Sequence, residues 1–205
     1  MPSTREILST DGYPISGFDA DAVFTPDDIL AGAEPESPVV IYDFDHYYMG
    51  SCLAELLRQR GSEVTIVTPA NAVSAWTFMN NESADIRVRM IDLGITTILE
   101  HYVIGFSNGS VELTNIYHDS DVSSIRSASL VVVGVRTGDD GLYEELDADP
   151  ERLANTGLSS LRSIGDCRAP GTIAHAVYSG HECARTIDAG DSIQPFAWER
   201  PRLSG

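Results

Sequence analysis

Two short stretches of the chain carry residues of the kinds that do chemistry at cofactor sites. In the first, Asp43 and Asp45 come directly after an apolar run, and His46 follows them. Paired carboxylates can bind a cation or act as an acid–base pair. They can also hold a loop through local hydrogen bonds. We favour the local hydrogen bonds, because the sequence offers no further ligands beside this pair, and we assign no catalytic residue.

The second stretch places Gly165 and Asp166 shortly before Gly171, Thr172 and Ile173. In two-dinucleotide flavoproteins a late strand ends in Gly-Asp, and its carboxylate faces hydroxyl groups of the cofactor. The helix that follows offers free N–H groups to the diphosphate. An ordinary capped helix after a strand is the alternative. We predict that these five residues bind an ADP- or FAD-like nucleotide, because of the elements that precede them.

The elements that must position the first stretch follow a strand–helix–strand order. Residues 39–45 open with a continuous apolar run, as a buried strand does. Residues 47–61 place leucines on one helical face and end on a glycine. Residues 63–68 form a second apolar run. This order within about 30 residues predicts a βαβ unit.

Further periodic segments extend the series, and an Asn-Gly pair joins two of them as a hairpin. The expected elements are a helix over 84–93, strands over 95–106, 110–117, 130–135 and 160–166, and a helix from Thr172 to about Asp188. We expect the residues beyond 188 to pack as a terminal arm.

Together these elements predict an α/β fold: a Rossmann-like NAD(P)/FAD-binding domain of the two-dinucleotide flavoprotein type, with part of a second such domain. We expect an extended lead-in over residues 1–37, in which Thr25 can cap one short helical turn. Residues 38–137 would form an NADPH-domain-like Rossmann unit. Residues 138–205 would form the second half of an FAD/ADP-binding-like domain.

The phosphate loop of the Rossmann unit is degenerate. A dinucleotide-binding βαβ unit carries Gly-x-Gly-x-x-Gly, whose glycines let the pyrophosphate approach the backbone. Here only Gly50 remains, roughly in the third position. Asp43 and Asp45 put carboxylates where a pyrophosphate would lie, and Tyr47 and Tyr48 fill the space. Charge and bulk therefore oppose NAD(P)H binding and argue against an independent NAD(P)H reductase.

Composition and charge exclude several classes of protein. The formal net charge is −18, and all 13 basic residues are arginine, which fits either a high-salt cytoplasm or a GC-rich genome. A field of this sign repels nucleic acids and anionic lipid surfaces. No apolar run approaches the roughly 20 residues that span a bilayer, and the amino terminus does not look like a secretory signal. We expect a cytoplasmic protein with no nucleic-acid or membrane partner.

Cysteine and histidine spacing predicts no metal site. Cys52, Cys167 and Cys183 lack the two-residue spacing that zinc and iron–sulfur sites use. His175 and His181 would lie on different faces of their helix. We interpret the thiols as free groups in a reducing compartment.

Four phrases of the sequence match one family in order and approximate spacing. Residues 43–50, 64–69, 73–76 and 164–174 resemble the carboxy-terminal region of the trimethylamine, dimethylamine and histamine dehydrogenases. These are FMN and iron–sulfur oxidoreductases related to 2,4-dienoyl-CoA reductase. The resemblance covers most of the chain, from about residue 8 to residue 198.

The resemblance implies cofactors and partners that lie outside this chain. Members of the family have a barrel that binds FMN and a [4Fe–4S] cluster, followed by FAD-like and NADPH-like domains. The barrel oxidises the amine, and an electron-transfer flavoprotein collects the electrons. The barrel and the first half of the FAD-like domain would precede residue 1 or belong to another subunit. We therefore expect a fragment, a split-gene subunit or a truncated reading frame, and the sequence does not name the amine.

Two hypotheses for function follow. The first is the carboxy-terminal nucleotide-binding and scaffold part of an amine-dehydrogenase-like oxidoreductase, N-demethylating or deaminating, without catalysis of its own. The second is a stand-alone Rossmann-like binding or interaction module without redox activity. A neighbouring reading frame that encodes the barrel would favour the first hypothesis, and an isolated gene would favour the second.

Overall fold

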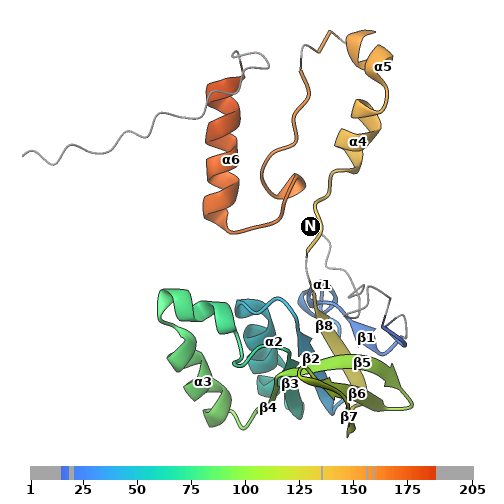
Figure 1. Ribbon diagram of the computed structural model, residues 1–205, viewed down its shortest axis with the longest axis vertical. Coiled ribbons are helices and arrows are strands. Elements are labelled where there is room, and N and C mark those ends of the chain that lie inside the picture. Colours follow the sequence, from blue (N-terminus) through green and yellow to red (C-terminus); the bar gives the residue numbers. More distant parts are fainter. Residues whose placement is uncertain (1–14, 19–20, 135, 156, 159, 188–205) are drawn as a thin grey trace, which may run out of the picture. The chain divides into compact units, whose positions relative to one another are not determined.

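In the computed structural model the chain consists of two compact units, and the boundary along the sequence falls between Thr137 and Gly138 (Figure 1). The residues that it describes are 15–18, 21–134, 136–155, 157–158 and 160–187. The start of the expected lead-in, the expected terminal arm and Asp188 lie outside the described residues. We describe the N-terminal unit, up to Thr137, and the C-terminal unit, from Gly138, separately.

A five-stranded parallel sheet forms the centre of the N-terminal unit (Figure 1). Its strands, in spatial order, are β1 (Val23–Phe24), β8 (Ser129–Val133), β2 (Val39–Asp43), β3 (Val64–Thr68) and β4 (Thr96–Leu99). All residues of β2 and β8 are buried, which is why both strands appear in the sequence as unbroken apolar runs. The middle of this sheet therefore needs a cover on each face.

Helices cover one face of the parallel sheet. They are α1 (Pro26–Leu30), α2 (Tyr48–Gln59) and α3 (Ser83–Asp92), and the 3-10 helix η1 (Ala75–Asn80) leads into α3. Leu53 and Leu57 lie one turn apart on α2 and pack with Ile41 and Ile66 of the sheet, together with Ile29 of α1. This cluster is one half of the hydrophobic core.

A three-stranded antiparallel sheet supplies the other half of the core. Its strands are β5 (His101–Ser107), β6 (Ser110–Asn115) and β7 (His118–Arg126). Val103, Val111 and Leu113 of this sheet pack with Val40 and Tyr42 of β2. The predicted hairpin between β5 and β6 is confirmed. The Asn-Gly turn that closes it has positive φ at both residues, 51° and 71°, as a two-residue hairpin turn requires.

The N-terminal segment before β2 is more regular than an extended lead-in. Strand β1 pairs with β8 at the edge of the sheet, and α1 buries Ile29 completely. Thr25 caps α1, because its Oγ1 accepts a hydrogen bond from the Asp28 N–H at 3.2 Å and its own N–H donates to Asp28 Oδ2 at 2.7 Å. The short helical turn was predicted, but β1 is too short to give a sequence signal.

The C-terminal unit is built from helices and loops. Its elements are α4 (Gly141–Asp147), α5 (Pro150–Asn155), the 3-10 helix η2 (Gly165–Cys167) and α6 (Ile173–Thr186). The prediction of a strand over 160–166 is wrong for the described residues, where an irregular segment leads into η2. A strand needs a neighbour for its backbone hydrogen bonds, and the described part of this unit contains no sheet.

At the level of fold class, the prediction of an α/β protein is confirmed, with a parallel sheet and a second, antiparallel sheet. The finer assignment of nucleotide-binding domains to residue ranges stays a prediction. None of the described helices has both the length and the hydropathy of a bilayer-spanning segment.

Hydrogen exchange on the intact chain should separate the two units. Amides of β2 and β8 should be strongly protected, because both strands are buried and have neighbours on both sides. Amides of α6 should exchange on the order of 100-fold faster or more, because no residue of that helix is buried. Mass spectrometry of proteolytic peptides measures both rates. Uniform strong protection over residues 160–187 in a proven monomer would contradict this expectation.

Candidate functional site

The degenerate phosphate loop lies where parallel α/β sheets bind their ligands. Strand β2 ends on Asp43 and helix α2 begins at Tyr48, so the loop crosses the carboxyl edge of the sheet. The backbone there is fixed by tertiary contacts. His46 adopts a positive φ of 62°, and its carbonyl accepts a hydrogen bond from the Trp76 N–H at 3.0 Å.

Asp43 is the most unusual residue of this loop, because its carboxyl group is fully buried. Its Oδ1 accepts a hydrogen bond from the His46 N–H at 3.2 Å. Its Oδ2 is buried without a hydrogen-bond partner among the described residues. Burial raises the pKa of Asp43 from its ordinary value of 3.8 to about 7, and the nearby charge of Asp45 also raises it, against the lowering effect of the His46 backbone N–H.

Gly50 makes room for this carboxyl group in the first turn of α2. A Cβ atom at position 50 would lie 2.6 Å from Asp43 Cγ and 2.8 Å from Asp43 Oδ2. No side chain can occupy that space. The one glycine that remains in the loop therefore accommodates the protein's own carboxyl group, in the region where an open loop would accommodate a pyrophosphate.

Asp45 and His46 belong to the same loop, and their side chains are half-buried. Burial raises the pKa of Asp45, and the charges of His46 and Arg136 oppose this shift. Burial lowers the pKa of His46, and the charge of Asp45 opposes that shift. His46 Nδ1 lies 3.3 Å from Thr68 Oγ1 at the end of β3. The loop is thus tied to the neighbouring strand as well as to η1.

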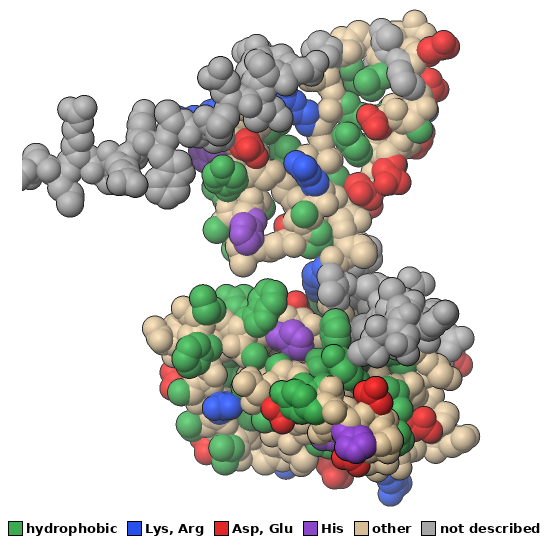
Figure 2. Space-filling view, viewed as in Figure 1, with side chains coloured by type: hydrophobic (Ala, Val, Ile, Leu, Met, Phe, Trp, Pro, Cys, Tyr) green, Lys and Arg blue, Asp and Glu red, His purple; other side chains and the backbone are tan. Residues whose placement is uncertain are grey.

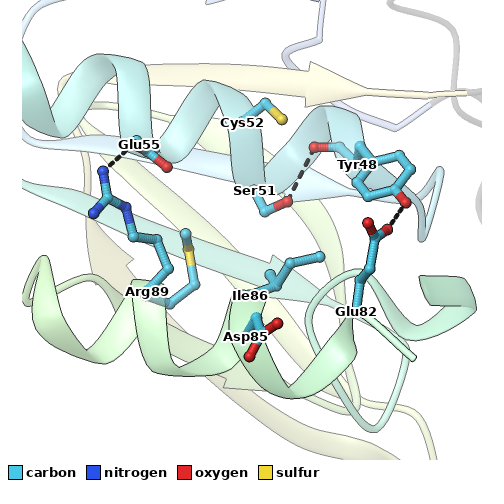
Figure 3. A pocket seen from close by; sticks show the side chains of 9 residues that line it. Tyr48, Ser51, Cys52, Glu55, Glu82, Asp85, Ile86 and Arg89 are labelled. Carbon is cyan, nitrogen blue, oxygen red and sulfur yellow. Dashed lines mark hydrogen bonds and ion pairs between the residues drawn. The ribbon is translucent and has the colours of Figure 1, made fainter. Parts of the chain in front are cut away.

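The rings of Tyr47 and Tyr48 contact each other in a tilted arrangement, with centroids 4.3 Å apart and planes at 57°. The Tyr48 hydroxyl donates a hydrogen bond to Glu82 and accepts one from Asn80 Nδ2 at 2.6 Å. Figure 3 shows Tyr48 and Glu82 pointing toward each other across a groove between α2 and α3. The sequence did not indicate this engagement of Tyr48.

The groove between α2 and α3 has a volume of about 380 Å³. Sequence reasoning did not single it out. Its lining residues are Tyr48, Ser51, Cys52, Glu55, Glu82, Asp85, Ile86, Arg89 and Met90 (Figure 3). Within the described residues no group of three His, Cys, Asp or Glu side chains could hold a metal ion.

The five residues of the second predicted site meet at the start of α6. Asp166 Oδ1 accepts a hydrogen bond from the Gly171 N–H at 3.2 Å and so closes the loop between them. Gly165 has a positive φ of 60°, and its N–H donates to Ser179 Oγ at 2.9 Å. Thr172 is the N-cap of α6, and the Ile173 side chain is 84% exposed. The loop therefore stands open to solvent at the amino end of a helix.

Two arginines were missed from the sequence: Arg168 directly follows η2, whereas Arg162 bonds to the carboxyl end of α6, which is distant in the chain. Arg162 and Arg168 line a hollow of about 590 Å³ against the side of α6. Arg162 donates hydrogen bonds to Thr186 Oγ1 at 2.9 Å and to the Thr186 carbonyl at 3.1 Å. Arg162 thereby satisfies a carbonyl at the carboxyl end of the helix.

The N-terminal unit is an α/β domain in which helices cover one face of a parallel sheet and an antiparallel sheet covers the other. The chain belongs to the family described as "OYE-like second alpha/beta domain", whose model matches residues 24–136. The predicted family resemblance is confirmed, since the chain is homologous to dimethylamine dehydrogenase and histamine dehydrogenase.

Three relatives define this homology. Dimethylamine dehydrogenase of Hyphomicrobium sp. (strain x) is 29% identical over 97% of this chain and 30% of its own length. Histamine dehydrogenase from Rhizobium sp. 4-9 is 35% identical, with a TM-score of 0.86 over 95% of this chain and 30% of its own. The 6-hydroxypseudooxynicotine amine oxidase of Pseudomonas geniculata N1 is 32% identical, with a TM-score of 0.78 over 85% of this chain and 26% of its own. The chain thus spans less than a third of each relative.

Substituting Gly50 by alanine should destabilise the N-terminal unit by about 1–3 kcal/mol, the usual range for overpacking a core. The reason is the 2.6 Å approach of the new Cβ to Asp43 Cγ. Chemical denaturation measures the free energy of unfolding. Gly180→Ala is the matched control, because this glycine also lies in a helix but has nothing within 4 Å of the added atom. Unchanged stability of Gly50→Ala would contradict the assignment, and Asp43→Ala in the same chain should relieve the loss.

The stability of the N-terminal unit should fall as pH rises from about 4 to about 7, because folding raises the pKa of Asp43 from 3.8 to about 7. The folded state then binds the proton more tightly than the unfolded state, so this contribution is fully present below pH 4 and is lost through pH 7. Asp43→Asn cannot ionise and should be more stable than wild type at pH 8, by about 4 kcal/mol, because each tenfold difference in proton affinity corresponds to about 1.4 kcal/mol.

Denaturation of both proteins across this pH range measures the difference. Asp119→Asn is the control, because Asp119 is exposed on β7. If the free energy of unfolding had the same pH dependence in wild type and Asp43→Asn, Asp43 would not be the titrating group.

Proposed function

We propose that this chain is the carboxy-terminal nucleotide-binding and scaffold module of an amine-dehydrogenase-like flavin and iron–sulfur oxidoreductase. The observation that carries the proposal is the relation to histamine dehydrogenase, at 35% identity and a TM-score of 0.86 over 95% of this chain. The likeness to dimethylamine dehydrogenase over 97% of the chain supports it. The module works with a region that carries the FMN barrel, in the same polypeptide or in another subunit.

In this proposal the chain does not oxidise the amine. FMN and the [4Fe–4S] cluster belong, by family resemblance, to the barrel, which lies outside the part of the relatives that this chain matches. When bound there, they supply amine oxidation and single-electron transfer, and an electron-transfer flavoprotein accepts the electrons. This chain contributes the nucleotide-binding part that accompanies the barrel, arranged as in two-dinucleotide flavoproteins.

The loop at the start of α6 suits an ADP- or FAD-like nucleotide. Asp166 and Gly171 close the loop, and Gly165 adopts a backbone conformation that a residue with a side chain rarely adopts. The Thr172 N–H donates to His175 Nδ1 at 3.4 Å, and the exposed first turn of α6 that begins at Ile173 offers N–H groups that attract a diphosphate. These residues would bind and orient the nucleotide without taking part in a reaction.

The loop at the end of β2 does not suit NAD(P)H. The Asp43 carboxyl fills the space against Gly50, and a pyrophosphate would need both that space and the helix N–H groups behind it. We therefore assign no nucleotide to the N-terminal unit. Its role in the proposed oxidoreductase is that of a scaffold.

A stand-alone interaction module remains the second candidate, and one observation favours it. The N-terminal unit has a parallel sheet that is covered on both faces by its own residues, so its fold does not require another chain. In that case the chain would have no redox partner and no nucleotide at Asp166.

Reconstitution tests the proposed function. The chain is purified alone and together with the barrel-bearing region of histamine dehydrogenase from Rhizobium sp. 4-9, and amine-dependent dye reduction is measured. We expect activity only in the combined protein. We also expect ADP to be bound, and Asp166→Ala should lower the ratio of ADP to protein at least tenfold, because the variant loses the carboxylate that closes the loop. The control is Asp147→Ala, at the end of α4 away from the loop. Amine oxidation by the chain alone, or full activity of the barrel region without it, would contradict the proposal.

A further inference from the structure

The 3-10 helix η1 displays three large apolar side chains in water. Trp76, Phe78 and Met79 are 64%, 76% and 88% exposed, and we call them the apolar ridge. Figure 2 shows hydrophobic side chains gathered over the end of the N-terminal unit where η1 lies. With roughly 150–250 Å² for each large aromatic side chain, the ridge exposes a few hundred Å². The largest apolar patch on a typical monomer is about this size and is often functional.

The backbone of η1 holds the ridge in place. Thr77, in the middle of the ridge sequence, is fully buried, and its Oγ1 donates a hydrogen bond to the Ser74 carbonyl at 2.7 Å. The Trp76 N–H donates to the His46 carbonyl at 3.0 Å. Ser74 and Asn81 bracket the helix with positive φ angles of 50° and 66°. The buried threonine forces its three apolar neighbours outward, so their exposure is built into the fold.

The ridge adjoins the groove between α2 and α3. Asn80, at the end of η1, donates hydrogen bonds to Tyr48 Oη at 2.6 Å and to Glu82 Oε2 at 2.9 Å, and both acceptor residues line the groove. Ile86 lies between α2 and α3 in the groove (Figure 3), and Met90 is a second apolar residue of its lining. The end of η1 therefore lies against the groove, one residue after Met79 of the ridge.

The charge of the groove is negative. Three carboxylates line it, from Glu55, Glu82 and Asp85, against one cation, Arg89. Arg89 is already ion-paired with Glu55, so the surplus charge lies at the ridge end of the groove. The whole chain has a formal net charge of −18. A second copy of this chain would bring the same charge to this surface, whereas a cationic partner would neutralise it.

We propose that the apolar ridge and the groove together dock an amphipathic, cationic segment of another polypeptide. Apolar side chains of the segment cover Trp76, Phe78 and Met79, and a lysine or arginine lies against Glu82 and Asp85. In this mode of recognition an amphipathic helix binds in a groove. The apolar face of the helix supplies the buried contacts, and its positive charges pair with the carboxylates of the groove. The inference goes beyond the proposed oxidoreductase and holds whichever polypeptide supplies the segment.

Binding of a defined peptide to the full-length chain tests this surface. The probe is an 18-residue amphipathic helix of leucine and lysine, and its partner peptide has glutamate in place of lysine. Trp198→Phe leaves Trp76 as the only tryptophan of the sequence, so a blue shift of its fluorescence reports coverage of the ridge. We expect the lysine peptide to bind and shift the emission, and the glutamate peptide to bind at least tenfold more weakly.

Matched variants separate this surface from general attraction to an acidic protein. Phe78→Ser, and Glu82→Gln with Asp85→Asn, should each weaken binding of the lysine peptide at least tenfold, while Phe78→Leu should keep it. The controls make the same kinds of change elsewhere: Ile91→Ser on α3, where Ile91 is 75% exposed, and Asp119→Asn with Asp121→Asn on β7. Circular dichroism and the melting midpoint establish that each variant is folded.

Three results would overturn the proposal. One is equal weakening by the control variants, which would leave only long-range charge attraction. Another is an unshifted Trp76 emission when the lysine peptide is bound. The third is concentration-dependent dimerisation in sedimentation experiments that Phe78→Ser abolishes, which would make a second copy of the chain the occupant.

Discussion

Strand β2 is buried on both faces, and the architecture of the N-terminal unit follows from that constraint. Successive side chains of a strand point to opposite faces. Val39 and Ile41 accordingly pack in the cluster under the helices, and Val40 and Tyr42 pack in the cluster under the antiparallel sheet. Each face needs its own cover, so neither layer can be removed without exposing half of the strand. The alternation continues to the last residue of β2, and it sends the Asp43 side chain toward α2.

The chemistry of the candidate site is set by this last step of the strand. A carboxyl group delivered to the helix side must be accommodated, and the backbone of α2 gives it room only at Gly50. The protein's own carboxyl group therefore occupies the space beside Gly50 that an anion would need. The loop at the start of α6 is built differently, because Asp166 binds the Gly171 N–H at the loop's own edge and leaves the helix end exposed. Two loops of similar expected purpose thus differ in the burial of their carboxyl groups, since Asp43 is fully buried and Asp166 is only half-buried.

Apolar runs predicted the central strands well, since β2, β3 and β8 begin within one residue of the predicted positions. The sequence gives no such signal for β7, which is a polar, almost wholly exposed edge strand. Residues 160–166 have a strand-like pattern but, among the described residues, no neighbouring strand to pair with. At the candidate site, the acidic residues of the loop could be identified from the sequence. The hydrogen bond from Tyr48 to Glu82 could not, because it joins residues 34 positions apart. Contacts of that kind depend on packing and leave no local pattern.

The close approach of position 50 to Asp43 also constrains the order in which mutations can accumulate. While the carboxyl group is present, any side chain at position 50 clashes with it, so selection for stability alone preserves this glycine. A change that opened the loop would have to remove the carboxyl group first, and the glycine would then already be in place. Positions 43 and 50 are thus coupled, because the residue at one decides which residues the other can hold.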